Sequence, residues 1–248
     1  MPVHCHLRLA GVVPLMLLLA SLCDAGTAHA QGGAPAAPPR RLEIWDIKLG
    51  TEASALPDEF VDLACGTGGG PPSLPLKNFA EFKRCRPEAS GLREVYFRYD
   101  DELEYWARAN GVLGQFEQFA GTKTYGFPVV ASVLFDDAGI AKGIRLVSDP
   151  RDDSQDRDEA YLLKNFLTAR FGRDGWDCRD LAAAPGETAV DGVFVKQECH
   201  KAIDAETSAS LAVRHLRKPG QNRLDPHSGR ETRGQFESAV HFELLRTR

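Results

Sequence analysis

The sequence predicts an α+β fold that consists mainly of antiparallel β-sheet, with one helix and two disulfide bonds. Short segments in which apolar and polar residues alternate recur along the chain, which is typical of half-buried strands. Only residues 158–171 show the wide apolar stripe of an amphipathic helix. Tight turns rather than helical crossovers join successive strands, which favours antiparallel pairing over a doubly wound α/β fold.

The expected strands follow from such alternation and from apolar runs that are bounded by turn residues. In residues 92–99, Val95 and Phe97 alternate with more polar neighbours, and residues 136–139, Asp-Asp-Ala-Gly, form a turn between two apolar runs. The other expected strands are residues 42–49, 129–135, 140–147, 190–198, 209–216 and 236–245. Residues 217–235 are polar, contain Gly and Pro, and are expected to form a loop.

Residues 103–109 have two interpretations. They form the second strand of a hairpin that turns at residues 100–102, or they belong to a helix that begins with the capping-box spacing of Asp101 and Glu104. The hairpin is favoured because the next segment of the chain repeats its layout.

Residues 1–30 have the three parts of a secretory signal peptide. Arg8 gives a positive start, residues 9–22 form an apolar run, and an A-x-A cleavage pattern ends at Ala30. The alternative is an uncleaved membrane anchor, but the run is shorter than the roughly 20 residues that span a bilayer. The expected location is therefore the periplasm or the extracellular side.

The remaining chain is expected to form one exported domain. Residues 31–40 are rich in Gly, Ala and Pro and predict a flexible leader. Residues 41–248 form the domain, and they contain no second apolar stretch of spanning length. Two strand–turn–strand units, with one cysteine pair on each side of them, suggest two related halves, residues 41–121 and 122–248.

Four of the six cysteines follow the signal, and an even number in an exported chain predicts disulfides. The shortest loops are closed by the pairs Cys65–Cys85 and Cys178–Cys199. A loop of about 15 residues contributes roughly 3 kcal/mol in the chain-entropy model. The alternative is a zinc site, but the C-x-x-C and H-x(3–5)-H spacings are missing. No cofactor is expected.

The charge pattern limits the choice of partners. The net charge of −5 is too acidic for a nucleic-acid-binding protein. Residues 214–248 carry an excess of basic side chains, and residues 136–160 an excess of acidic ones. Either the basic end attracts an anionic partner, or the two patches face each other within the fold.

The glycine-rich loop is the first candidate site; its residues are Gly66, Thr67, Gly68, Gly69 and Gly70. A phosphate-binding loop leads into a helix and carries a conserved glycine spacing, which prolines interrupt here. The loop is therefore expected to be a disulfide-closed structural or recognition loop.

An acidic run supplies the only metal candidates, Asp152, Asp156 and Asp158. A calcium loop of the EF-hand type that starts at Asp152 needs Gly at position 157 and Glu at position 163. The sequence has Arg157 and Leu163 instead. The favoured interpretation is a solvated loop whose last acids stabilise the start of a helix, so no metal is expected.

A catalytic constellation is not evident. The G-x-S-x-G pattern of a nucleophile elbow is missing. Carboxylates at residues 100–104 could serve glycosidase-type chemistry, and the histidines after the signal are His200, His215, His227 and His241.

The sequence thus favours a non-catalytic binding or accessory protein of the cell envelope, with an unidentified envelope protein or ligand as its partner. The alternatives are an envelope hydrolase with an Asp/Glu–His site and a metal-dependent protein.

Overall fold

The computed structural model describes residues 42–99, 110–111, 122–151, 158–221, 227–230 and 235–247. All of them belong to one compact unit, Arg40–Arg248. The predicted signal peptide (residues 1–30), the leader (residues 31–40) and the ambiguous segment (residues 103–109) lie outside the described residues.

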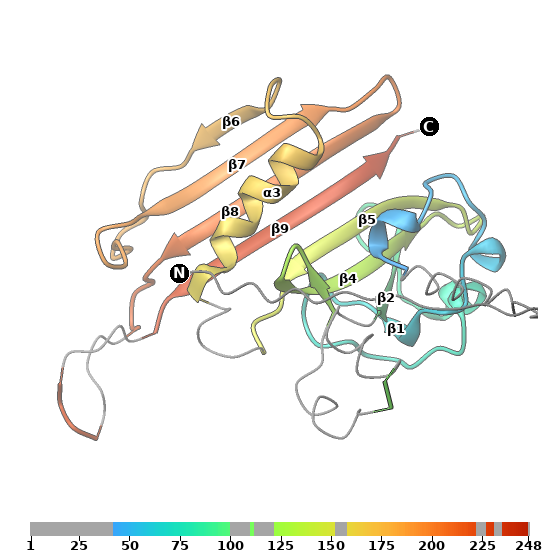
Figure 1. Ribbon diagram of the computed structural model, residues 1–248, viewed down its shortest axis with the longest axis horizontal. Helices are drawn as coiled ribbons and strands as arrows, with labels where there is room; N and C mark the ends of the chain where they lie inside the picture. The colour runs from blue at the N-terminus through green and yellow to red at the C-terminus, as the bar shows by residue number, and fades with distance from the viewer. Residues whose placement is uncertain are drawn as a thin grey trace, which may run out of the picture. The chain divides into compact units, whose positions relative to one another are not determined.

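In the described part of the chain, nine strands form one antiparallel sheet, with the strand order β1-β2-β4-β5-β9-β8-β7-β6 and with β3 paired to β4 (Figure 1). The strands are β1 (Val61–Cys65), β2 (Arg93–Arg98), β3 (Lys123–Thr124), β4 (Phe127–Phe135), β5 (Ala141–Ser148), β6 (Asp177–Asp180), β7 (Val195–Ala202), β8 (Thr207–Leu216) and β9 (Glu237–Arg246). Strand β9 lies between β5 and β8, although it is the last described strand in chain order.

Most of the predicted strands are confirmed. The expected strands at residues 92–99, 129–135, 140–147, 209–216 and 236–245 correspond to β2, β4, β5, β8 and β9. Strands β2 and β4 pair through five registered positions, so strands from both suggested halves share the sheet. That the two halves are related remains a prediction.

Two segments differ from the expectation. The segment 42–49 is not a strand but contains the 3-10 helix η1 (Ile44–Asp46). Here the backbone N–H of Glu43 donates to the Asp46 carboxylate at 2.9 Å, and this local bond favours a turn over extended backbone. The strand expected at 190–198 begins later, at Val195, because residues 190 and 193 exchange backbone hydrogen bonds in a tight turn.

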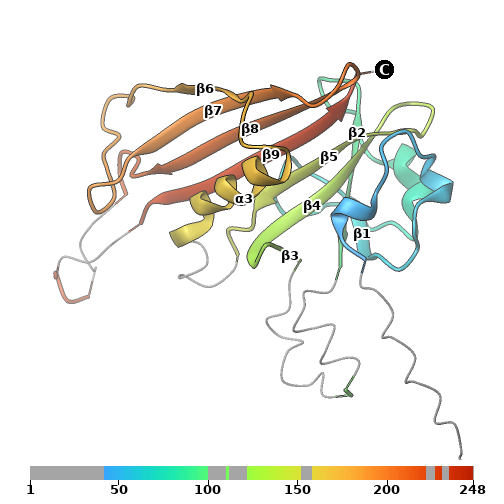
Figure 2. The same ribbon diagram turned by 45° about the horizontal axis from the view of Figure 1, so that its top comes forward.

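The predicted helix forms a 3-10 turn, η5 (Ala160–Leu162), followed by helix α3 (Leu163–Arg170). Figures 1 and 2 show α3 lying over β8 and β9 on one face of the sheet. Its buried face carries Leu163 and Leu167, both with 0% exposure, at the i, i+4 spacing of one helix face. Lys201 Nζ donates to the carbonyl of Phe171 at 2.6 Å, just past the helix end, which satisfies a free C-terminal acceptor.

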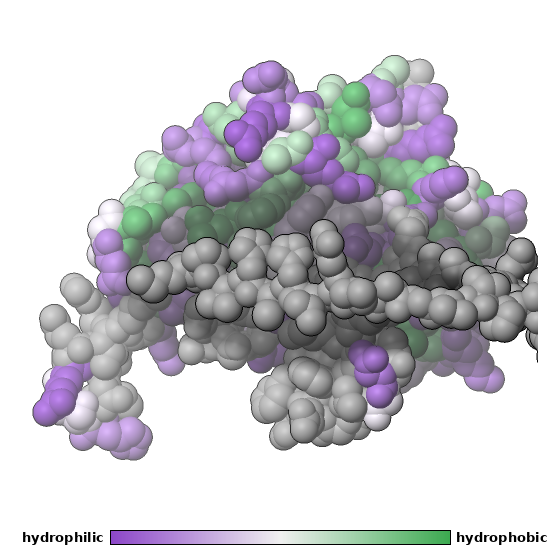
Figure 3. Space-filling model, viewed as in Figure 1, coloured by the Kyte–Doolittle hydropathy of each residue, from purple (hydrophilic) through white to green (hydrophobic). Residues whose placement is uncertain are grey.

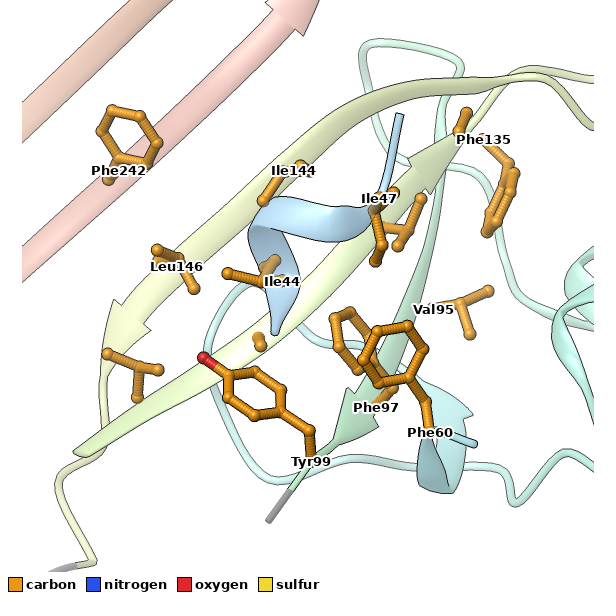
Figure 4. Close-up of a cluster of buried hydrophobic side chains, with 14 of the residues drawn as sticks. Ile44, Ile47, Phe60, Val95, Phe97, Tyr99, Phe135, Ile144, Leu146 and Phe242 are labelled. Carbon is orange, nitrogen blue, oxygen red and sulfur yellow. The ribbon is translucent and has the colours of Figure 1, made fainter. Parts of the chain in front are cut away.

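The core lies on this same face of the sheet. The 3-10 helix η1, a second one, η2 (Ala53–Ala55), and a third, η3 (Phe79–Arg84), contribute to it beside the strands. Figure 4 shows Phe60 next to Phe97, with ring centroids 4.6 Å apart. In Figure 3, seen from the same side as Figure 1, apolar residues lie between polar ones. The burial of these aromatic rings is a main source of stability.

The disulfides Cys65–Cys85 and Cys178–Cys199 form as the spacing predicted. The first joins the end of β1 to the residue after η3, and the second joins directly opposed positions of β6 and β7. A fold with two disulfides is consistent with an oxidising compartment. Among the described residues, no helix is both long enough and apolar enough to cross a membrane.

Candidate binding site on the polar face of the sheet

The face of the sheet opposite the core carries polar side chains across several strands. Because side chains alternate along a strand, the register places one row of residues on this face, which we call the polar face. The row runs through Tyr96, Ser132, Arg145, Glu243, Ser210 and His200. The neighbouring positions Val95 and Ile144 point to the core.

Arg145 of β5 is the centre of a charged group that we call the arginine cluster, which consists of Arg145, Glu88, Glu94 and Glu243. The guanidinium binds Glu88 in a bidentate manner at 2.6 and 3.0 Å. It also lies 2.9 Å from Glu94 Oε2 and donates to Glu243 Oε1 at 2.7 Å. Arg145 is 7% exposed and Glu94 2%. Charges are stable at such depth only when they are paired and hydrogen-bonded.

Two carboxyl groups of the cluster have a lowered pKa. The pKa of Glu243 falls to about 2, chiefly because His241 hydrogen-bonds to it at 3.1 Å and because Arg145 binds it, although burial acts in the opposite direction. The pKa of Glu88 is also lowered, first by the hydrogen bond from Arg145, with burial again opposing, and in smaller part by a hydrogen bond with Glu94. Glu243 therefore stays ionised to low pH and keeps His241 in place.

The structure brings the glycine-rich loop to this cluster. The backbone N–H of Gly68 donates to Glu94 Oε2 at 2.6 Å. A Cβ atom on Gly66 would lie 2.3 Å from Glu94 Cδ, so only glycine fits at that position. Gly69, with φ of 90°, lies against Val147. The loop thus lies against Glu94 of the arginine cluster with its backbone, and Gly66 is needed for this close approach.

A cavity of about 590 Å³ lies beside Gly69. Its volume is within the range of small-molecule sites in proteins. Its walls carry charges of both signs, amides and an aromatic ring; they include Asp149, Asp158, Lys218, Gln221, Gln235, Phe236 and Glu237. Lys218 and Glu237 form an ion pair of 2.5 Å on one wall. Asp149 and Asp158 of the acidic stretch and Lys218 of the basic stretch thus line one cavity, whereas the ion pair of Lys218 is formed within its own stretch.

A smaller hollow of about 190 Å³ lies over β8, and we call it the trough. The small side chains of Ser210 and Ala212 line it from β8, while one histidine and one glutamate border it from each neighbouring strand: Glu198 and His200 from β7, and His241 and Glu243 from β9. The register puts Glu198 opposite His241 across Ala212, and His200 opposite Glu243 across Ser210. Strand spacing places β7 and β9 about 9.5 Å apart.

Val147 links the two hollows, because it lines the cavity and pairs with His241, which lines the trough. The polar face thus offers a ligand two adjacent hollows, and the arginine cluster fixes Glu243 in the wall of the trough. The polar face also carries an imidazole–carboxylate pair, His241 and Glu243, which is a common arrangement for general acid–base chemistry.

Other candidates from the sequence lie elsewhere. His215 is 2% exposed and contacts the Tyr161 ring at 4.2 Å between centroids, as expected for a structural histidine. Asp152 and Asp156 lie outside the described residues, as do the carboxylates of residues 100–104. Asp158 lines the cavity, and its carbonyl accepts a hydrogen bond from Ser238. No group of three or more metal-ligating side chains occurs in the described part of the chain.

Sequence reasoning did not single out the arginine cluster. Its strand members, Glu94, Arg145 and Glu243, occupy alternate positions in otherwise apolar segments, which normally indicates a solvated face. Glu88 lies in a loop after the first disulfide. The only indication in the sequence is that charged residues of opposite sign occur near the middle of otherwise apolar strands. Without the strand order, these charges cannot be assigned to one another as partners.

Comparison with protein-family models, with curated proteins and with solved structures finds no match for this chain.

Proposed function

We propose that this protein is a non-catalytic binding or accessory protein of the cell envelope, exported to the periplasm or the extracellular side, and that it holds its ligand on the polar face. One observation carries the proposal: a buried four-residue charge cluster fixes Glu243 in the wall of the trough and holds the glycine-rich loop beside the cavity. The predicted signal peptide and the two disulfides support the exported location.

The cluster is well suited to preorganise a binding surface. Burying an arginine with three glutamates contributes little to stability compared with apolar packing of the same volume. What the cluster does provide is fixed positions for Glu243, His241 and the glycine-rich loop. A ligand that meets side chains already held in place loses less entropy on binding.

The composition of the walls indicates a polar ligand. Lys218 and Asp158 supply opposite charges to the cavity, and the amides of Gln221 and Gln235 can both donate and accept hydrogen bonds. Phe236 provides an apolar surface at the same cavity. Such a mixture suits a small molecule, or a short stretch of a partner chain, that carries several polar groups.

The test is native mass spectrometry of the full-length protein isolated from the envelope fraction of its own host. We expect the wild-type protein to carry additional mass from a ligand or partner. The variant Ala239→Trp places an indole in the cavity and should lose this mass. The control Ala183→Trp makes the same change in an exposed loop and should keep it. A bare wild-type protein, or a ligand retained by Ala239→Trp, would contradict the proposal.

The second candidate is an envelope hydrolase, favoured by the pair of His241 and Glu243. A carboxylate that orients a histidine is a common arrangement for a general base. This function predicts that His241→Gln abolishes hydrolysis in a panel of ester, peptide and glycoside substrates, whereas the control His227→Gln keeps it. Equal activity of the two variants, or none in the wild type, would exclude this site as the catalytic centre.

A further inference from the structure

Three aromatic side chains and one arginine form a group at the surface near the end of helix α3, on the core side of the sheet. It consists of Trp45 from η1, Tyr125 from the turn between β3 and β4, and Phe166 and Arg170 from α3. We call these four residues the aromatic platform. Three separate elements of the fold therefore converge on it, although the residues are far apart in sequence.

The rings are ordered by direct contacts. Tyr125 stacks on Phe166 with centroids 5.6 Å apart and an interplanar angle of 20°. The Arg170 guanidinium lies 4.2 Å from the centroid of the Trp45 ring, a cation–π contact. Arg170 Nη1 also donates to the Tyr125 hydroxyl at 3.4 Å. The platform thus combines flat apolar faces with hydrogen-bonding groups at their edge.

Tyr125 has an unusual backbone conformation. Thr124 pairs with Phe127, so Tyr125 and Gly126 form a two-residue hairpin turn, and both have positive φ, 53° and 81°. Such turns strongly prefer Asn or Asp before Gly, because a bulky side chain is strained at positive φ. A tyrosine there opposes the local preference, and strained residues of this kind cluster at functional sites.

The exposed part of the platform is small. Tyr125 remains 40% exposed and Phe166 45%, despite their stacking. Since an aromatic side chain presents about 150–250 Å² in total, the two rings together leave on the order of 200 Å² open. A stable protein–protein interface buries about 800 Å² on each partner. The open area of the two rings is about a quarter of what such an interface needs, so these rings alone favour a smaller ligand.

We propose that the aromatic platform is a saccharide-binding site. The apolar C–H face of a pyranose ring stacks on the exposed Tyr125–Phe166 pair, and its hydroxyl groups bind the Arg170 guanidinium and the Tyr125 hydroxyl. The inference is independent of the polar face, because it depends only on these rings and their exposure.

The test is a calorimetric titration of the full-length protein with two probes, the tetramer of N-acetylglucosamine and the tetramer of α-1,4-linked glucose. We expect at least one probe to bind. Tyr125→Asn should weaken that binding at least about tenfold, while the melting temperature stays the same or rises because Asn suits the turn. Phe166→Ala should also weaken binding, and the control Val193→Ala, which alters an equally exposed apolar residue elsewhere, should not.

Three results would overturn the proposal. The first is that neither tetramer binds with a Kd below about 10 mM. The second is that Tyr125→Asn binds as tightly as the wild type. The third is that the wild type self-associates and Tyr125→Asn does not, which would make the platform a contact between protein chains.

Discussion

Replacement of Arg145 by methionine should destabilise the protein strongly. Methionine is unbranched and apolar, of comparable volume, and carries no charge, so Glu88, Glu94 and Glu243 lose the cation that binds all three. Removing one partner from a buried ion pair typically costs about 3–5 kcal/mol. Glu94 is 2% exposed and cannot regain water without unfolding, whereas the Glu88 side chain is 28% exposed and can. The cost of about 3–5 kcal/mol therefore arises mainly from Glu94, whose carboxylate stays buried without its cation.

The measurement is urea and thermal unfolding at pH 7 with both disulfides intact, followed by circular dichroism. For a domain of roughly 200 residues, a loss of about 3–5 kcal/mol lowers the Tm by about 6–20 °C. The double variant Arg145→Met/Glu94→Gln removes the buried charge that the single variant leaves behind. We expect its loss of stability to be smaller, by about 1–2 kcal/mol, than the sum of the losses caused by Arg145→Met and Glu94→Gln alone.

A loss of less than about 1 kcal/mol in Arg145→Met, the value of a surface ion pair, would contradict a buried charge left without its cation. Additive effects of the two substitutions would contradict it as well, because residues that depend on one another show a coupling energy.

Two further predictions concern the same cluster. The folded-state pKa of Glu243 is lowered to about 2 by His241 and Arg145. Its ionised form therefore stabilises the fold above pH 4.5, and this contribution is lost as the pH falls toward 2. Glu243→Gln should flatten the acid limb of a stability–pH curve, and an unchanged acid limb would contradict this. Gly66→Ala should lower the Tm because the new Cβ collides with Glu94, with a cost of about 1–3 kcal/mol; a thermal melt equal to that of the wild type would show that the loop adjusts freely.

Sequence patterns predicted those parts of the fold in which a strand is long enough to show either an alternating pattern or a continuous apolar run. Strands β4 and β8 are nine and ten residues long, and their apolar pattern was clear. Strand β6 has four residues, all exposed, so no alternation could indicate it. Its place is set by pairing with β7 and by the Cys178–Cys199 disulfide, and only the cysteine spacing pointed to that contact.

The candidate site was predictable only in fragments. The glycine-rich loop was singled out by composition, but its role depends on Glu94, 26 residues further along from Gly68. Arg145 and Glu243 are 98 residues apart, and they meet only because β9 pairs with β5. A strand order of this kind is a long-range property, which local periodicity does not contain.

The position of β9 has a consequence for the order of folding. A chain that emerges N-terminus first presents β1 to β5 and then β6 to β8, yet these two sets of strands share no direct strand pairing along the main order of the sheet. Their open edges, β5 and β8, remain unpaired until β9 enters between them and forms hydrogen bonds with both. Completion of the sheet must therefore wait for the last described strand. Until then each set exposes an edge that can pair with another chain, so a truncation just before β9 would leave two incomplete sheets prone to aggregation.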